Sequence, residues 1–244
     1  MNIRVLKLGS ICVEAFEPDI AYLEKLRYGL TCASNAILIS TEDEHLLVDT
    51  SFENESDTSA ENTRKNHDIL RTSLKEFGLT PSDITKVYIT HWHRDHFGNL
   101  DLFPDAEIFT GQLAARRQRY PRRLHGIREG KEVINSSDIR VLNTPGHTID
   151  HTSLVIHTNE KIVVIAGDAI TSLSYYLMGK IWNLNVDFYE EDIAIGSVRK
   201  ITNIADLIFP GHGPPFYNQK QLTITLPKTI ELSSKKEEKN YDRI

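Results

Sequence analysis

Short runs of Val, Ile and Leu recur along this chain, and most of them end in turn-forming residues. This spacing is typical of short β-strands, because a strand needs few residues and the turns between strands favour Gly, Pro, Asn, Asp and Ser. We therefore expect strands over residues 3–8, 36–39, 46–48, 87–90, 107–110, 139–142, 153–157, 162–166 and 207–209.

Apolar side chains at helical spacing predict three helices. The clearest covers residues 59–77, where apolar side chains share one face and Gly78 follows as a stop signal. Two further helices are expected over residues 190–203 and 112–119. The strands come first as hairpins and then alternate with helices, and this order favours a sheet core covered by helices.

The composition is that of a globular protein with one large core. The chain has 244 residues, of which 40% are apolar and 25% are charged. We expect a single domain over residues 1–227 and a polar C-terminal tail over residues 228–244. No apolar window is long enough to predict a membrane-spanning helix. The formal net charge of −6 argues against a protein that coats nucleic acid through a broad excess of Lys and Arg.

Two features of the N-terminal region predict a cytoplasmic location. Arg4 and Lys7 lie within the first apolar run and no cleavage-site signature follows, so this run predicts a strand rather than a signal peptide. Cys12 and Cys32 could pair, but two cysteines without a signal peptide favour reduced, structural thiols.

The segment HWHRDH, residues 91–96, is the strongest chemical signal in the sequence. An apolar run delivers three histidines and an aspartate to the loop just beyond its end, and imidazole and carboxylate suit divalent metals such as zinc. His91 and His93 alternate in an extended segment, so they can hold one ion together. Asp95 and His96 lie past the turn and can face a second ion. Four fixed residues in this pattern arise by chance in on the order of one chain in a thousand.

Three later segments repeat the arrangement of an apolar run followed by a polar residue. Residues 141–147 end in Pro-Gly-His with His147, residues 162–168 end in Asp168, and residues 207–213 contain Pro-Gly-His-Gly with His212. A carboxylate after a buried strand is costly to bury without a partner, and a metal ion supplies one. Each segment alone is only modestly informative, but together with the first motif they predict a metal site.

The order of HWHRDH, TPGH, GDA and PGHG resembles the metallo-β-lactamase superfamily and covers nearly the whole chain. The resemblance implies an α/β fold, the four-layer αβ/βα sandwich, with metals at one edge of the paired sheets. It also implies a ligand set by motif position: His91, His93 and His147 for one ion, Asp95, His96 and His212 for the other, and Asp168 as the bridge. The implied cofactors are two zinc ions, with iron or manganese as alternatives.

The chemistry that this resemblance implies is hydrolysis by a metal-activated hydroxide. Two ions that share one water lower its pKa towards neutrality, and one of them stabilises the oxyanion that develops. Asp95 is the residue expected to orient the hydroxide and to pass a proton to the leaving group. No Gly-x-Ser-x-Gly nucleophile motif is present.

Two classes of function stay open at this point. Asp168 stands where true β-lactamases commonly have a cysteine, which argues against antibiotic hydrolysis. Many acyl-homoserine lactonases, which this site resembles, have a tyrosine three residues later, where this chain has Thr171; Tyr175 and Tyr176 follow soon after. We expect these two tyrosines to contact the substrate of an ester- or lactone-type hydrolase. The alternative is a phosphodiesterase that cleaves nucleic acid.

A basic stretch over residues 116–123 bears on the substrate. Its arginines are Arg116, Arg117, Arg119, Arg122 and Arg123. One interpretation is a solvated helix face and loop. The other is that Arg119, Arg122 and Arg123 line the substrate entrance and attract a small anionic substrate or nucleic acid, because guanidinium matches carboxylate and phosphate. The sequence is also compatible with a homodimer and predicts no membrane partner.

The remaining conspicuous polar residues are expected to have supporting roles. His151 lies four residues after His147 and is expected to hydrogen-bond or pack behind a ligand. Asp49 ends an early strand and is expected to support the site rather than to bind metal. The other histidines are expected to be ordinary surface or satisfied residues: His45, His67, His125 and His157.

Overall fold

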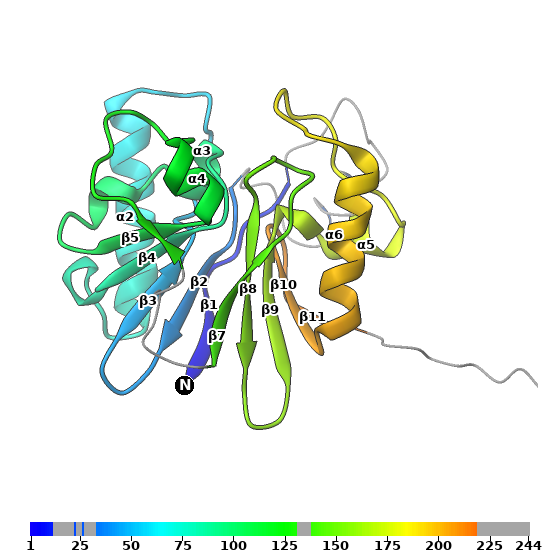
Figure 1. Ribbon diagram of the computed structural model, residues 1–244. Coiled ribbons are helices and arrows are strands. Elements are labelled where there is room, and N and C mark those ends of the chain that lie inside the picture. Colours follow the sequence, from blue (N-terminus) through cyan, green and yellow to red (C-terminus); the bar gives the residue numbers. More distant parts are fainter. Residues whose placement is uncertain (12–21, 23–25, 27–32, 131–137, 219–244) are drawn as a thin grey trace, which may run out of the picture.

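Two β-sheets lie face to face, and helices cover the outer side of each sheet (Figure 1). The structure is a computed structural model that describes residues 1–11, 22, 26, 33–130 and 138–218. The four layers expected from the resemblance are confirmed. The predictions for Cys12, Cys32 and the tail over residues 228–244 lie outside the described residues.

The first sheet has six strands in chain order, antiparallel at its start and parallel from β3 onwards. Its strands are β1 (Asn2–Lys7), β2 (Ala36–Ser40), β3 (His45–Val48), β4 (Lys86–Ile89), β5 (Glu107–Thr110) and β6 (Arg128–Glu129). The second sheet has five strands, and only β9 and β10 pair in parallel. Its strands, in spatial order, are β11 (Phe216–Tyr217), β10 (Leu207–Pro210), β9 (Ile162–Gly167), β8 (Thr152–His157) and β7 (Ile139–Asn143).

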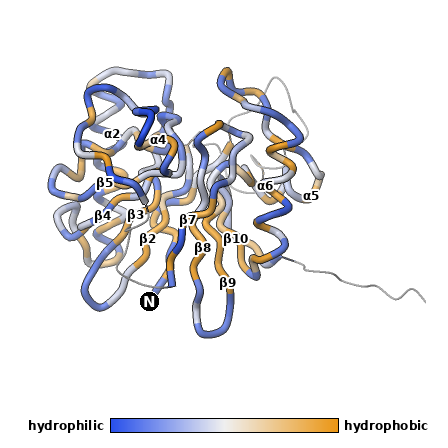
Figure 2. The backbone as a smooth tube through the Cα atoms, viewed as in Figure 1, coloured by the Kyte–Doolittle hydropathy of each residue, from blue (hydrophilic) through white to orange (hydrophobic). Residues whose placement is uncertain are grey.

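Alternate residues of each strand pack into different layers. In β2, Ile37 and Ile39 pack between the sheets, whereas Leu38 packs under the helical layer. In β9, Val163 and Ile165 face the first sheet, and Val164 packs with the outer helices. Because both faces of these strands are buried, their sequences are continuously apolar rather than alternating. Figure 2 shows the hydrophobic strands between hydrophilic loops.

Five helices complete the outer layers of the described part of the chain. They are α2 (Ala60–Glu76), α3 (Arg94–Phe97), α4 (Gln112–Arg117), α5 (Leu173–Leu177) and α6 (Glu191–Ile204), with short 3-10 helices at Pro81–Asp83, Leu100–Leu102 and Asp168–Ile170. Helix α2 begins after Ser59, whose side chain accepts from Asn62 N, and it buries Leu70 and Leu74. None of the described helices is both long and apolar enough to cross a bilayer.

The predicted elements agree with the structure to within one residue at nearly every end. The exception is the helix expected over residues 112–119, because α4 ends at Arg117. The helix ends there because Gln118 adopts a left-handed conformation with φ 48°. Helices α3 and α5 and strands β6 and β11 were not predicted, because each is too short to show a period in the sequence.

Asn35 joins the two sheets at the end where their ligand loops meet. Its side-chain amide donates to Pro210 O at 2.9 Å and to Gly213 O at 2.7 Å, and its Oδ1 accepts from Gly9 N at 2.7 Å. Its backbone N–H donates to Gly211 O at 2.7 Å. One buried side chain therefore satisfies three backbone groups from two distant segments.

We expect Asn35→Ala to lower the free energy of unfolding by about 3 kcal/mol, because three buried backbone groups lose their partner. For a chain of this size that loss corresponds to a fall of roughly 6–12 °C in Tm. Thermal unfolding followed by circular dichroism measures it. The matched control is the exposed Asn203→Ala, which should change stability by no more than about 0.5 kcal/mol. Equal Tm values for both variants would show that Asn35 does not join the sheets.

Candidate metal centre

The seven residues predicted as ligands meet at one edge of the paired sheets. Four of them follow β4: His91 and His93 lie in the loop, and Asp95 and His96 belong to the short helix α3 that comes next. The other three follow strands of the second sheet, namely β7, β9 and β10, and they are His147, Asp168 and His212. Each strand end therefore delivers a polar side chain to the same junction.

Three histidines converge at one end of this junction. His93 Nδ1 lies 3.0 Å from His91 Nε2 and 3.0 Å from His147 Nε2. Zinc–nitrogen bonds of about 2.1 Å at tetrahedral angles separate two ligand atoms by roughly 3.4 Å, so this spacing suits a shared ion. His91 and His147 are buried and His93 is partly buried.

Asp95, His96 and His212 form a second cluster beside the first. Asp95 Oδ2 lies 3.4 Å from His96 Nε2 and 3.5 Å from His212 Nε2. Asp168 lies between the clusters, because its Oδ2 is 3.4 Å from His147 Nε2 and 3.5 Å from His212 Nε2. Its Oδ1 is 3.4 Å from His96 Nε2. Asp168 is therefore the carboxylate that contacts ligand groups of both clusters.

The electrostatics of the cluster are those of a site built for positive charge. Burial alone would raise the pKa of Asp168, but His212, His96 and His147 hold that pKa well below its usual value. Burial would lower the pKa of His96, yet the carboxylates of Asp95, Asp49 and Asp168 raise it well above normal. The carboxylates and imidazoles of the cluster therefore favour each other's charged forms at Asp168 and His96.

The fit of a metal ion rests on the donor set and on orphaned polar atoms. His96 Nε2 and Asp168 Oδ1 are buried, face the cluster and have no hydrogen-bond partner within the described part of the chain. A buried polar atom without a partner costs free energy, and an ion at the cluster would coordinate both atoms. Burial and the neighbouring histidines lower the pKa of His91, which keeps its imidazole neutral as a ligand must be.

Groups behind the ligands fix which ring nitrogen faces the cluster. Asp49 Oδ2 lies 2.7 Å from His96 Nδ1, and Asp49 also accepts from Thr90 N and Thr90 Oγ1. His212 Nδ1 donates to Ala33 O at 2.8 Å. Asp49 therefore lies behind His96, in the supporting position expected for it. Contacts of this kind orient metal-binding imidazoles.

Asp187 orients His93 in the same way, and no pattern in the sequence indicates this role. Its Oδ1 lies 2.9 Å from His93 Nε2, so Nδ1 of that ring faces the cluster. Asn185 donates to Asp187 Oδ1 at 2.8 Å and to His147 O at 2.8 Å. The hydrogen bond with His93 lowers the pKa of Asp187 and keeps it charged. Asp187 lies in an irregular segment 94 residues from His93, and no local pattern links them.

The backbone of Gly211, in the turn that carries His212, lies directly against the carboxylate of Asp168. A Cβ atom at Gly211 would lie 1.7 Å from Asp168 Oδ1, so no other residue fits there without moving the carboxylate. The glycine of the Pro-Gly-His-Gly motif is therefore required by this contact rather than by a turn alone.

A pocket of about 400 Å³ opens over the cluster. Its walls come from the N-terminal segment, the loop after β3 and the segment before α6, and Trp182 and Leu184 form an apolar side. Among the described residues it is lined by the acidic Glu55, Asp95 and Asp168 and by neither lysine nor arginine. Burial, and then the nearby Asp95, raise the pKa of Glu55.

The two tyrosines expected to contact substrate do not line this pocket. Tyr175 and Tyr176 line a neighbouring apolar pocket that shares Thr171 and Trp182 with it. Tyr176 points away, because its ring stacks on Phe216 and its hydroxyl donates to Asn218 Oδ1 at 3.0 Å.

The structure does not bring the basic stretch to the metal pocket either. Arg119 Nε lies 3.3 Å from Asp150 Oδ2 and so supports the turn after His147. Arg122 and Arg123 are exposed on the loop beyond α4. Arg119, Arg122 and Arg123 are thus not among the residues that line the metal pocket; Gln118 turns the chain in a left-handed conformation and Arg119 pairs with Asp150.

His151 packs behind the ligands, in line with its expected supporting position. Its ring lies 5.0 Å from that of His91, its Nδ1 is 2.9 Å from Thr144 Oγ1, and burial lowers its pKa to about 3. Its Nε2 faces the backbone at Gly167, where a Cβ would lie 2.9 Å away. The imidazole is therefore a neutral part of the core beneath the site.

Comparison with known protein families supports this reading of the site. The model of the Metallo-beta-lactamase superfamily matches residues 29–212. Metallo-beta-lactamase domain-containing protein 1 of Xenopus laevis is 37% identical over 153 residues, which cover 61% of this chain and 62% of that protein. The human protein of that name is 34% identical over 147 residues, which cover 57% of this chain and 51% of that protein. The chain thus spans less than two thirds of these relatives, whose likeness is already visible in residues 98–104 and 210–216.

Solved structures share the architecture at low sequence identity. A probable metal-dependent hydrolase of Staphylococcus aureus has a TM-score of 0.62 and 18% identity, covering 86% of this chain and 88% of that one. The dizinc quorum-quenching lactonase AidC has a TM-score of 0.57 and 18% identity, covering 88% of this chain and 92% of that one. At this level of identity, these structures show a common fold.

Asp187→Ala should weaken metal binding by about 10- to 100-fold, because His93 loses the group that orients it. Asp187 is largely solvent-exposed, so the fold should be unaffected. Titration of the metal-free protein with zinc in competition with a chelator measures the affinity. The exposed Asp105→Ala serves as the control and should bind zinc like the unmodified protein. Unchanged affinity in Asp187→Ala would show that His93 needs no partner at Nε2.

Proposed function

This chain belongs to the metallo-β-lactamase superfamily, and we propose that it is a metal-dependent hydrolase that attacks an ester, lactone or similar carbonyl. The observation that supports this most is the position of Asp168, within 3.5 Å of imidazoles from both ligand clusters. Two metal ions joined by one carboxylate are a recurrent arrangement in hydrolytic enzymes. Zinc is the proposed ion, with iron and manganese as alternatives.

The seven ligand residues divide into two sets, one for each proposed metal ion. His91, His93 and His147 would hold one ion, Asp95, His96 and His212 the other, and Asp168 both. When bound, such ions lower the pKa of water towards neutrality and stabilise negative charge on the substrate oxygen.

Asp95 lies on the pocket wall and is the proposed proton carrier. Its side chain is partly exposed to the pocket, so it can take a proton from the attacking water and deliver it to the leaving group. The apolar side of the pocket, with Trp182 and Leu184, excludes water around the scissile bond.

A small neutral or weakly polar substrate suits the pocket better than nucleic acid does. Phosphodiester backbones are held mainly by Lys and Arg, and the described lining residues include neither. Glu55, the acidic lining residue that is not a proposed ligand, also adds negative charge beside the site. The nuclease alternative therefore has no specific support in this part of the chain, and the partner proposed is a small-molecule substrate.

We expect the protein to bind about two zinc ions per chain, and Asp168→Ala to retain one or fewer. The reason is that Asp168 serves both clusters, so its removal weakens both sites. Elemental analysis after saturation and desalting measures the content, and kcat/KM should fall by at least about 100-fold. Asp105→Ala again controls for a lost surface carboxylate. Saturation of the unmodified protein at about one ion would overturn the dinuclear proposal.

A substrate panel separates the two function classes. We expect turnover of chromogenic esters and lactones that is lost on chelation and restored by zinc, with His91→Ala as the inactive reference. Single-stranded RNA should stay intact under the same conditions. Metal-dependent RNA cleavage, with binding that weakens steeply as salt is raised, would instead establish the nuclease.

A further inference from the structure

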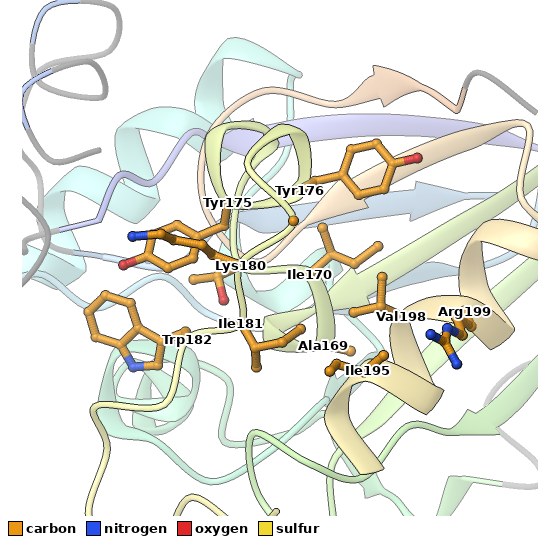
Figure 3. Close-up of a pocket in the computed structure, with 12 residues that line it drawn as sticks. Ala169, Ile170, Tyr175, Tyr176, Lys180, Ile181, Trp182, Ile195, Val198 and Arg199 are labelled. Atoms are coloured by element: carbon orange, nitrogen blue, oxygen red, sulfur yellow. The ribbon is translucent and has the colours of Figure 1, made fainter. Parts of the chain in front are cut away.

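An apolar pocket lies beside the metal pocket, between α5, α6 and the segment that connects them (Figure 3). Its volume is about 230 Å³. Its principal walls are Ile170, Tyr175, Ile181, Trp182, Ile195 and Val198. Figure 3 shows these side chains around one space: they come from the 3-10 helix after β9, from both helices and from the connecting segment, which carries Ile181 and Trp182.

The apolar pocket adjoins the metal pocket. Thr171 and Trp182 line both pockets. Thr171 comes three residues after Asp168, and its carbonyl accepts from His212 N at 2.8 Å. A molecule that extends from the apolar pocket past Thr171 and Trp182 would therefore reach the side of the metal ligands.

The lining decides what kind of group fits. Most of it is aliphatic or aromatic, and its charged members, Lys180 and Arg199, are both basic. No acidic residue of the described chain lines it. A cationic or strongly hydrated group would lose its solvation there, whereas an apolar group gains from burial. Cavities of about 150 Å³ with apolar walls hold a benzene ring, so a ring or a chain of several carbons has room.

Some apolar side chains of α5 and of the segment that follows it are exposed. Leu177, the last residue of α5, and Met178 have 68% and 48% of their surface exposed, and Leu184, which lines the metal pocket, has 40% exposed. Exposed apolar side chains therefore lie close in sequence to the lining of both pockets.

We propose that this pocket binds the hydrocarbon part of the substrate, the acyl chain or aromatic acyl group of an ester or lactone. The inference rests on the proposed hydrolase function, since the acyl carbon must reach the metal ligands. Ester hydrolysis adds water across the acyl–oxygen bond: the acid retains the apolar group in the pocket, and the alcohol leaves through the metal pocket. Tyr175, predicted from the sequence to contact substrate, would then contact its hydrocarbon part and not its carbonyl group.

A series of p-nitrophenyl esters from acetate to octanoate tests the inference with the zinc-loaded protein. We expect kcat/KM to rise about two- to four-fold per methylene until the pocket is filled. Val198→Phe narrows the pocket and should lower kcat/KM for the octanoate at least tenfold, while the acetate changes less than about twofold. The matched control is Ile193→Phe, a partly buried residue of the same helix that does not line the pocket.

A second variant and a binding measurement keep the two proposals separable. Ile181→Ser makes the lining polar without adding bulk, and it should also reduce the preference for the octanoate ester. It therefore replaces Val198→Phe as the test if that variant does not fold. Binding of 1-octanol to the metal-free protein, followed by Trp182 fluorescence in a Trp92→Phe background, needs no turnover. If the protein binds octanol, Ile181→Ser weakens that binding and no ester is hydrolysed, the proposed binding pocket stands and the proposed hydrolase activity is wrong. If esters are hydrolysed at rates that do not depend on chain length, the proposed binding pocket is wrong and the proposed hydrolase activity stands.

Discussion

The buried carboxylate of Asp168 is the constraint on which the rest of the site depends. A lone charged carboxylate in the protein interior costs several kcal/mol, so its neighbours must supply positive charge. Here the neighbours whose pKa is raised are His96, which follows a strand of the first sheet, and His212, which follows a strand of the second. Correct packing of one sheet on the other is therefore the condition for charge balance, and the fold and the centre form together.

The supporting contacts extend this dependence into the core. Asp49 holds His96 from beneath and at the same time accepts from the backbone of Thr90, the residue before His91. Asp49 and Ser51 have positive φ angles of 55° and 52°, conformations that non-glycine residues seldom adopt. Such local strain persists where surrounding contacts over-determine the backbone, as the hydrogen bonds around Asp49 do. The first ligand loop is thus fixed by the strand next to it.

The strands and the ligand residues were accessible from the sequence for physical reasons. Burial on both faces makes strands such as β9 continuously apolar, and a ligand that ends a strand stands out against that background. Tertiary contacts leave no such mark. Asp187 is an ordinary loop aspartate until folding places it on His93, and the five arginines look like a substrate rim until Arg119 pairs with Asp150. Tyr175 and Tyr176 are adjacent in sequence, yet helix α5 turns Tyr176 towards Phe216, away from the metal pocket.

The segment between α5 and α6 links substrate selection to the metal centre. It carries Ile181 and Trp182, which line the apolar pocket, and Asp187, which orients His93. Asn185 ties the same segment to the backbone of His147. The stretch of backbone that lines one side of the apolar pocket is therefore the same stretch that contacts two of the three histidines of the first cluster.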